Sequence, residues 1–323
     1  MPVRRVLITG ATGFVGINVA RRMIARGHDV HCLVRASHRA WRLPELEGAA
    51  ALHVADLLDP AEIDALLGAV RPQWLLHLAA YGAYASQSDA RTCVRTNVEG
   101  SVNLIDAAAR HGVERFVNTG SSSEYGFKDH APDEDEALEP NSLYAVTKAA
   151  ATAYACYAAR SGRLHATTLR LYSVYGPYEE PTRLIPTLVV HGLNGAFPPL
   201  VAPETARDFV YVDDVLAAYE AALRAEIPPG RVFNVGTGTQ TTLRTAAGVG
   251  RSYFGITAEP DWGSMASRTW DTTAWVANIA RARAELGWAP STPFEEGFRR
   301  TATWLSESRE RRSFYETART PLA

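Results

Sequence analysis

The chain has 323 residues, of which 46% are hydrophobic and 21% charged, and its formal net charge is −2 at pH 7. This length and composition are typical of a globular protein with one large domain or two. The balanced charge argues against a nucleic-acid partner, and no polybasic patch marks a membrane surface. No apolar run reaches the roughly 18 residues of a membrane span, and the N-terminus opens directly into a strand. We therefore expect a cytoplasmic protein with neither a signal peptide nor a membrane segment.

The three cysteines, Cys32, Cys93 and Cys156, lie in apolar surroundings. They form no CxxC pair and have no His-rich partner pattern, which zinc sites require. We predict buried free thiols in a reducing compartment, and no metal site.

Residues 3–9 are rich in β-branched side chains and end at the glycines of Gly10-Ala-Thr-Gly-Phe-Val-Gly16. A helical pattern over 15–26 and a second strand pattern over 29–34 follow. Glycines let a backbone approach a pyrophosphate, and the N-terminus of a helix offers it unpaired N–H groups. We predict a dinucleotide site, although a plain tight turn is the alternative for a glycine motif taken alone. The predicted contacts are Gly10, Thr12, Gly13, Phe14 and Val15.

The end of the second strand indicates which dinucleotide binds. NAD sites usually place a carboxylate there for the ribose 2′-hydroxyl, whereas NADP sites use an arginine for the 2′-phosphate. This chain has Arg35 and Arg39 at that place and no acid. NADP(H) is favoured, with NAD as the alternative, unless both arginines are merely solvated loop charges.

Further strand patterns cover 50–54, 73–78, 114–119 and 164–171, with helical patterns over 60–70, 86–111 and 141–160. This alternation predicts an α/β fold of the Rossmann type, with a doubly wound parallel sheet. Ligands of such sheets bind beyond the carboxyl ends of the strands. We therefore expect one crevice to contain the residues that follow the strands. Its further cofactor contacts are Asp56, Leu57, Leu78, Ala79, Ala80, Tyr172 and Val174.

The segment 141–160 carries Tyr144 and Lys148, which lie four residues apart and share one face of a helix. A cation beside the phenol lowers its pKa from about 10, which makes Tyr144 a candidate general acid or base. Ser121, Ser122 and Ser123 are candidates for a hydroxyl that polarises a substrate oxygen beside Tyr144. A chance Tyr–Lys spacing and an ordinary serine turn are the structural alternatives.

The pattern changes near residue 179, where prolines become frequent. We expect a dinucleotide-binding domain over 1–178, joined again by strands within about 208–235. A smaller mixed region over 179–207 and 236–323 would bind the substrate. The charged run 306–313 predicts a solvated helix end or tail.

Several ordered motifs resemble the extended short-chain dehydrogenase/reductase family, in its nucleotide-sugar branch. The matching motifs are Thr9-Gly-Ala-Thr-Gly-Phe-Val-Gly16, Asp56-Leu57, His77-Leu-Ala-Ala80, Asn97-Val-Glu-Gly100, Ser121-x-x-x-Tyr-Gly126, Tyr144-x-x-x-Lys148, Tyr175-Gly-Pro177, Arg207-Asp-Phe-Val-Tyr-Val-Asp-Asp214, Asn234-Val-Gly236 and Leu286-Gly-Trp288. The resemblance implies that Ser121, Tyr144 and Lys148 are the catalytic residues. It also implies a bound nucleotide-diphosphate sugar and, as in dimers of the family, a homodimer built on the helices 86–111 and 141–160. The alanine-rich faces of these helices could instead pack within the chain.

Arginine forks suit phosphate oxygens, so Arg207, Arg268 and Arg183 resemble diphosphate ligands, with surface salt bridges as the alternative. Other expected substrate contacts are Tyr81, Ser122, Ser123 and Ser173, while Tyr84 and Trp270 are expected to shape the pocket.

Departures from the family pattern indicate the reaction. Dehydratases of the family carry an acid–acid pair where Ser122 and Ser123 stand, and decarboxylases usually carry Glu at the second of these positions. Glu124 resembles the pattern of some 4-keto-6-deoxysugar reductases. We therefore expect NADPH-dependent reduction of the 4-keto group of a nucleotide-diphosphate 4-keto-6-deoxy sugar, with a proton from Tyr144. The alternatives are a 4-epimerase with permanently bound NAD, and a dinucleotide sensor without chemistry, against which the intact Ser–Tyr–Lys set argues.

Overall fold

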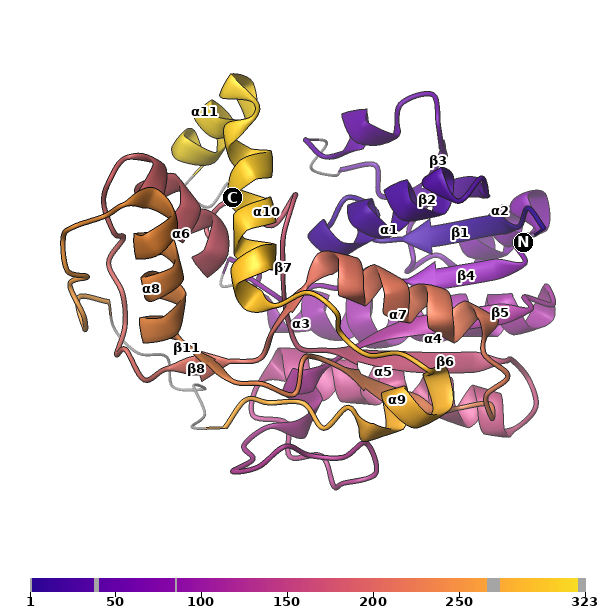
Figure 1. The fold of residues 1–323 in the computed structure, drawn as a ribbon. Helices are drawn as coiled ribbons and strands as arrows, with labels where there is room; N and C mark the ends of the chain where they lie inside the picture. Colours follow the sequence, from indigo (N-terminus) through magenta and orange to yellow (C-terminus); the bar gives the residue numbers. More distant parts are fainter. Residues whose placement is uncertain (1, 38–40, 85, 266–273, 319–323) are drawn as a thin grey trace.

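The computed structural model describes residues 2–37, 41–84, 86–265 and 274–318. Arg39, Arg268 and Trp270 lie outside these residues. The described chain contains a seven-stranded sheet in the order β10-β6-β5-β4-β1-β2-β3, and all its neighbouring strands are parallel (Figure 1). Its strands are β1 (Arg5–Thr9), β2 (Asp29–Val34), β3 (Ala51–Val54), β4 (Trp74–His77), β5 (Arg115–Ser121), β6 (Ala166–Leu171) and β10 (Val232–Val235). The predicted doubly wound α/β fold is confirmed.

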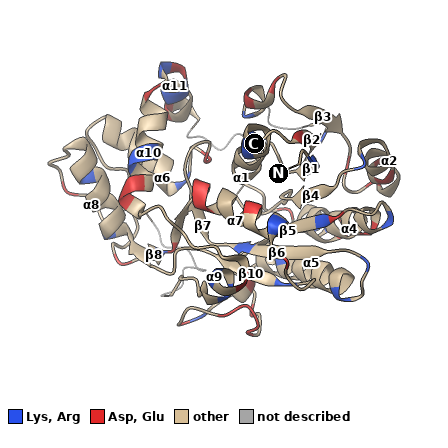
Figure 2. Cartoon of the chain, turned by 45° about the vertical axis from the view of Figure 1, so that its right-hand side comes forward, with Lys and Arg blue, Asp and Glu red and all other residues tan. Residues whose placement is uncertain are grey.

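Helices cover both faces of the sheet because successive side chains of a strand point to opposite faces. In β1, Val6 and Ile8 join a core with α1 (Phe14–Ala25) and α7 (Val212–Arg224). Leu7, between them, joins the opposite core with α2 (Pro60–Val70), α4 (Gly100–Arg110) and α5 (Leu143–Arg160). Both faces of β1 are therefore apolar, as in a fully covered sheet. In Figure 2, basic and acidic residues are interspersed along the chain in both lobes of the molecule.

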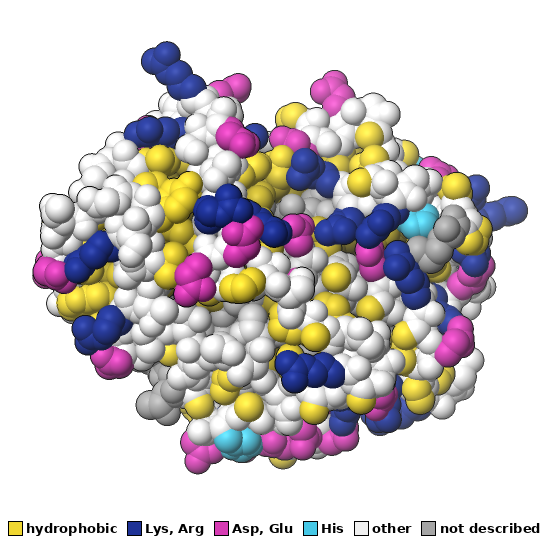
Figure 3. Space-filling model, viewed as in Figure 1, with side chains coloured by type: hydrophobic (Ala, Val, Ile, Leu, Met, Phe, Trp, Pro, Cys, Tyr) yellow, Lys and Arg dark blue, Asp and Glu magenta, His cyan; other side chains and the backbone are white. Residues whose placement is uncertain are grey.

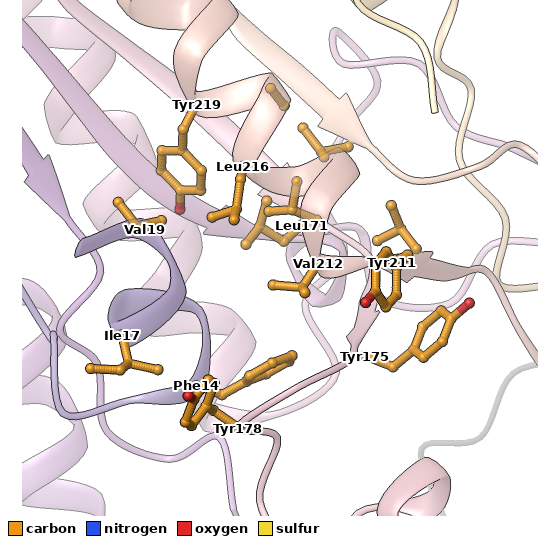
Figure 4. Packing of buried hydrophobic residues seen from close by; sticks show 14 of the residues in the cluster. Phe14, Ile17, Val19, Leu171, Tyr175, Tyr178, Tyr211, Val212, Leu216 and Tyr219 are labelled. Carbon is orange, nitrogen blue, oxygen red and sulfur yellow. The ribbon is translucent and has the colours of Figure 1, made fainter. Parts of the chain in front are cut away.

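The first of these cores continues into the C-terminal lobe. Figure 4 shows Phe14 and Ile17 of α1 near Tyr178, and Val212 and Leu216 of α7 near the end of β6. Aromatic rings from two further strands, β7 (Ser173–Tyr175) and β9 (Phe209–Tyr211), extend the same cluster. The two lobes therefore share one continuous apolar core.

Two elements differ from the predicted ones. The helix expected over 86–111 begins at Ala90, because the Asp89 carboxylate accepts a hydrogen bond from Thr92 N–H at 2.7 Å and caps it. It consists of α3 (Ala90–Val94), a π-helical turn (Arg95–Glu99) and α4. Of the strands expected within about 208–235, the first, β9, does not join the main sheet. β9 instead pairs with β7 in a separate two-stranded sheet, whereas the prediction for β10 is confirmed.

The C-terminal lobe consists mainly of helices over short strands. Its elements are α6 (Leu184–Leu193), β8 (Ala206–Arg207), β11 (Thr241–Thr242), α8 (Leu243–Phe254), α9 (Ala280–Leu286), α10 (Phe294–Ser306) and α11 (Arg309–Thr317). The short helix η1 (Leu43–Leu46) lies between β2 and β3 and packs on α1. Figure 3 shows a hollow between α11 and the segment that contains η1, with hydrophobic side chains inside it. None of the described helices is both long enough and apolar enough to cross a membrane.

The charged run 306–313 is exposed or half-buried throughout and covers the end of α10 and the start of α11, which confirms the predicted solvated helix end. Later in α11, Tyr315 is buried and donates a hydrogen bond to the Glu179 carbonyl at 2.6 Å. Phe314 packs on Trp41, with ring centroids 4.8 Å apart. The charged residues lie beside this apolar contact. The charge pattern of the sequence did not predict that a buried aromatic side chain follows them. All three cysteines are buried free thiols, as predicted.

The Asp208 side chain links its own segment by hydrogen bonds to two other segments of the C-terminal lobe, at residues 237–238 and at residue 277. Its buried carboxylate accepts hydrogen bonds from Thr237 N–H and Oγ1 at 2.6 Å each, from Gly238 N–H at 2.9 Å and from Ala277 N–H at 3.0 Å. Removal of this carboxylate leaves several donors unpaired.

We expect Asp208→Ala to lower the free energy of unfolding by about 3 kcal/mol, the cost of buried unpaired donors. Urea denaturation followed by circular dichroism measures the change. The exposed Asp261→Ala is the matched control, and it should change stability by no more than about 0.5 kcal/mol. Equal stabilities of the two variants would show that the Asp208 contacts are energetically unimportant.

Candidate active site at the carboxyl edge of the sheet

The turn after β1 lies against the end of β4. Gly10 has φ +75°, and a Cβ on it would lie 2.6 Å from both Leu78 C and Ala79 N. Only glycine permits this approach, since any side chain would collide with fixed backbone. The glycine turn and the segment Leu78–Ala80 therefore share one crevice, as the sequence predicts.

The N-terminus of α1 fits an anionic group. Its N-cap is Gly13, and among the described residues no side chain caps the helix and no acid lies in its first turn. A Cβ on Gly16 would lie 2.1 Å from Gly10 O, so the turn is tightly closed. The first N–H groups, which include those of Phe14 and Val15, have no partner within the helix and suit a pyrophosphate. The residues present therefore fit a dinucleotide.

The ends of β2 and β3 carry the other predicted cofactor residues. Arg35 is exposed directly after β2, and no carboxylate stands there. After β3, the exposed Asp56 accepts a hydrogen bond from Leu58 N–H at 3.0 Å, which shapes its own turn. Leu57 is buried beneath it, against Gly100.

A buried polar chain supports this crevice from below. Thr9 Oγ1 lies 2.7 Å from His77 Nδ1 and accepts hydrogen bonds from Leu78 and Ala79 N–H at 3.2 Å. His77 Nε2 lies 2.9 Å from Ser101 Oγ, which donates to the Asn97 carbonyl. Burial lowers the pKa of His77 to about 3, so the ring is neutral at physiological pH. Since Ser101 already donates, Nε2 carries the proton and Nδ1 accepts from Thr9.

Asn97 connects the loop after β4 to the helix α5. Its Oδ1 accepts from Tyr81 N–H at 2.8 Å, and its Nδ2 donates to Tyr81 O at 2.8 Å and to Thr147 Oγ1 at 2.9 Å. Asn97 lies in the π-helical turn, a distortion that is frequent at functional sites. Tyr81 is thereby held beside the helix that carries Tyr144.

The structure brings the predicted catalytic residues together. Ser121 ends β5, while Tyr144 and Lys148 lie in the first turns of α5, which Ser142 caps. The Ser121 side chain acts to lower the pKa of Tyr144, as a nearby hydroxyl that can donate to the phenolate does. Gly82 lies so close that a Cβ there would be 3.3 Å from the Tyr144 ring.

The expectation that Lys148 lowers the pKa of Tyr144 is wrong for this structure. Burial raises the pKa of Tyr144 to about 12, and the Ser121 hydroxyl only partly opposes it. Burial also lowers the pKa of Lys148, so the low-dielectric surroundings disfavour both charges. Spacing along a helix does not reveal this burial. The phenol is therefore protonated at neutral pH and can donate its proton.

Glu124 has a structural role that the sequence comparison did not reveal. Its fully buried carboxylate accepts from Ser121 N–H at 2.8 Å, from Thr152 Oγ1 at 3.0 Å and from Arg170 Nε at 2.8 Å. With Ser121 it forms a capping box on η3 (Ser122–Tyr125). These contacts join the Ser121 backbone to α5 and β6. Glu124 therefore positions Ser121.

A narrow pocket opens beside Ser122. Its lining includes Tyr172 and Trp275, and it has room for about one water-sized group. The Tyr172 hydroxyl is buried and has no hydrogen-bond partner among the described residues. Tyr172, which we expected at the cofactor, thus lines a pocket next to the predicted substrate serines. Ser173 and Val174 are half-buried in β7.

The predicted phosphate ligands lie in the C-terminal lobe. The Arg207 guanidinium lies 5.1 Å from the centre of the Trp275 ring. Arg183 precedes α6, and its guanidinium lies 6.0 Å from the centre of the Tyr84 ring. The charge of Arg183 acts to lower the pKa of Tyr144, and Tyr84 acts to raise it. Arg268 is outside the described residues, and its predicted contact stays a prediction.

Sequence reasoning missed three residues. Arg42 is buried and donates to Thr12 O at 3.0 Å and Tyr178 O at 2.9 Å, which joins the glycine turn to the second lobe. Asn97 was visible only as part of a family motif. Glu179 lies in a proline-rich stretch whose sequence pattern did not predict a buried carboxyl group.

We expect Glu124→Gln to lower the free energy of unfolding by about 3–5 kcal/mol, because Arg170 would remain buried without its counter-charge. The matched control is Glu139→Gln, which removes the exposed partner of Lys128 and should cost about 1 kcal/mol or less. Chemical denaturation of both variants measures the difference. Similar costs for the two changes would contradict the importance of the buried pair.

Comparison with known proteins agrees with the geometry. The model of the NAD dependent epimerase/dehydratase family matches residues 6–236. The chain is 32% identical over 322 residues to UDP-glucose 4-epimerase of Mycolicibacterium smegmatis, covering 93% of this chain and 98% of the relative. It is 30% identical over 317 residues to dTDP-glucose 4,6-dehydratase of Streptomyces griseus, covering 94% of both.

Among solved structures, MoeE5 in complex with UDP-glucose and NAD aligns with a TM-score of 0.82 at 28% identity, covering 94% of this chain and 98% of MoeE5. The family model alone matches well over half of the chain, and it matches the part that holds the glycine turn, Ser121, Tyr144 and Lys148. The chain therefore belongs to the NAD dependent epimerase/dehydratase family, the extended short-chain dehydrogenase/reductase enzymes of nucleotide sugars.

Proposed function

We propose that the protein reduces the 4-keto group of a nucleotide-diphosphate 4-keto-6-deoxy sugar with NADPH. The observation that carries this proposal is the effect of the Ser121 hydroxyl on Tyr144, in a site without an acid–base pair beside it. Ser122 and Ser123 stand where a dehydratase needs two acids. The Glu124 carboxylate is paired with Arg170, so it does not replace them as an acid or base. Redox chemistry at C4 is thus supported, whereas elimination is not.

The roles of the catalytic residues follow from their protonation. A nicotinamide bound in this crevice would supply the hydride. Tyr144 is a protonated phenol and donates its proton to the oxygen on C4, while the Ser121 hydroxyl donates a hydrogen bond to the same oxygen. Lys148 lies on the same helix face and would contact the cofactor ribose and favour the phenolate left after proton transfer.

The cofactor preference rests on Arg35. Its exposed guanidinium follows β2, where a 2′-phosphate would lie and where no carboxylate selects the free ribose of NAD. The other proposed cofactor contacts, in the glycine turn, at Asp56 and Leu57 and along Leu78–Ala80, serve either dinucleotide.

The substrate would lie between the two lobes. We assign the dinucleotide to residues 1–178 together with about 208–235, and the nucleotide sugar to 179–207 and 236–323. Arg183 and the N-terminus of α6, which has no acid in its first turn, suit a diphosphate, as does Arg207. Tyr81, Ser122, Ser123 and Ser173 would then contact the sugar.

A second candidate is a nucleotide-sugar 4-epimerase that retains NAD. The favouring observation is the 32% identity with the UDP-glucose 4-epimerase of M. smegmatis over nearly both chains. Such an enzyme would use the same three residues to remove and return the hydride. The two candidates differ in whether the cofactor leaves the site.

We also propose a homodimer. α3 and α5 lie side by side and expose several large apolar side chains. These are Val94, Leu143, Val146 and Tyr157. An exposed apolar patch of this kind is typical of an interface.

We expect the purified protein to bind NADPH more tightly than NADH, and Arg35→Ala to weaken NADPH binding roughly ten- to a hundredfold without changing NADH binding. Equilibrium titration of both dinucleotides measures this, together with extraction of any cofactor that copurifies. Tightly retained NAD without a preference for NADPH would reject the reductase and support the epimerase.

We expect Tyr144→Phe to lower kcat by roughly a hundredfold or more, because it removes the proton donor and little else. NADPH oxidation is assayed against 4-keto-6-deoxy sugars linked to dTDP, CDP, GDP and UDP. Tyr157→Phe, at an exposed site on the same helix, is the control and should retain wild-type activity. An active Tyr144→Phe enzyme would remove Tyr144 from the mechanism.

A further inference from the structure

Glu179 carries a buried carboxyl group that is only partly paired. Its side chain is 6% exposed, and its Oε2 has no hydrogen-bond partner among the described residues. The nearest cation is Arg183, whose Nε lies 4.0 Å from Oε1, a loose contact for an ion pair. Arg183 is itself 47% exposed and can turn toward solvent or a ligand.

The backbone holds this carboxyl in place. Tyr178 has φ +70°, a strained value for a residue with a side chain, and such strain persists only where neighbours enforce it. Asn18 Nδ2 donates to Pro177 O at 2.9 Å, Arg42 Nε donates to Tyr178 O at 2.9 Å, and the Tyr315 hydroxyl donates to Glu179 O. Three different elements therefore fix the turn, and Glu179 cannot simply move into solvent.

The surroundings favour the neutral acid. Burial raises the pKa of Glu179 to about 8, although Arg183, a backbone hydrogen bond at Gly176 and Arg42 oppose this. Arg42 is already paired with Glu180 at 3.2 Å. The other titratable and charged groups around it are Tyr84 in the loop after β4, Tyr175 on β7, and Tyr315 and Arg311 on α11. At neutral pH, Arg183 thus faces an uncharged carboxylic acid.

We propose that Glu179 sets the affinity for the substrate: as a neutral acid it leaves Arg183 available to the diphosphate, and as a carboxylate it competes for Arg183. This inference rests on the proposed function, in which Arg183 is a diphosphate ligand. When Arg183 turns to the diphosphate, Glu179 loses its nearest cation and gains a neighbouring anion. Both changes favour its protonated form, so binding takes up a proton from solvent wherever Glu179 is ionised in the free protein.

The test uses UDP-glucose, dTDP-glucose, CDP-glucose and GDP-glucose, whose diester phosphates do not titrate near neutral pH. Titration calorimetry at about pH 6.5 and about pH 9 should show that affinity falls up to about tenfold at the higher pH. At about pH 8, two buffers of different ionisation enthalpy should reveal net proton uptake. Both effects should disappear in Glu179→Gln and persist in Glu204→Gln, which alters an exposed pair with Arg244.

The outcomes separate the two proposals. If none of the four nucleotide sugars binds at either pH, the proposed function fails and this inference fails with it. If binding occurs without proton uptake, or if Glu179→Gln retains the pH dependence, only this inference is overturned. The wild-type calorimetry decides the matter even if Glu179→Gln does not fold.

Thermal unfolding gives a readout without any ligand. The pKa of Glu179 is higher in the folded chain than in the unfolded one, so the folded state binds the extra proton. The contribution of Glu179 to stability is therefore complete at low pH and is lost as the pH rises toward about 8. We expect the melting temperature of the wild type to fall more steeply between about pH 6 and about pH 8 than that of Glu179→Gln. Parallel curves would contradict the buried neutral acid.

Discussion

The active site depends on the ion pair between Glu124 and Arg170 beneath Ser121. The Glu124 carboxylate binds the backbone of Ser121, a threonine of α5 and an arginine of β6, so it fixes Ser121 relative to the helix that carries Tyr144. Arg170 extends the connection to the Tyr125 hydroxyl and the Glu134 carbonyl. Because every partner is buried, loss of one charge would leave the other uncompensated. The position of Ser121 and the stability of the fold thus depend on the same contact.

A second polar layer supports the cofactor side. Thr9, His77 and Ser101 form a chain under the glycine turn, and Asn97 continues it to Tyr81 and α5. The neutral imidazole suits this position, since each ring nitrogen has one partner of the right kind. Fully satisfied buried networks hold a single arrangement, which a site that aligns two reactants requires.

Much of the fold could be predicted from the sequence, because β1 to β6 have apolar runs bounded by glycine and polar turns. The place of the glycine turn, Ser121, Tyr144 and Lys148 at one edge of the sheet could be predicted, because these residues follow strands or lie in the first turns of a helix. The pairing partner of β9 could not be predicted, because a strand of three residues has too short a side-chain pattern to indicate which sheet it joins. The role of Glu124 was hidden because Arg170 lies 46 residues away. The pKa of Tyr144 was predicted in the wrong direction because burial is a property of the whole fold.

Under the proposed function, the two lobes would divide the work: the sheet and α5 would carry the chemistry, and the second lobe would bind the substrate. The residues that we propose as catalytic lie on the sheet and α5, where packing and buried hydrogen bonds restrict them. The arginines expected to bind diphosphate lie on the second lobe, beside turns and short strands that tolerate change. The strained turn at Tyr178 and the Asp208 carboxylate help to set how that lobe meets the sheet. Substrate choice could therefore vary in the second lobe while Tyr144 keeps its proton and its neighbour Ser121.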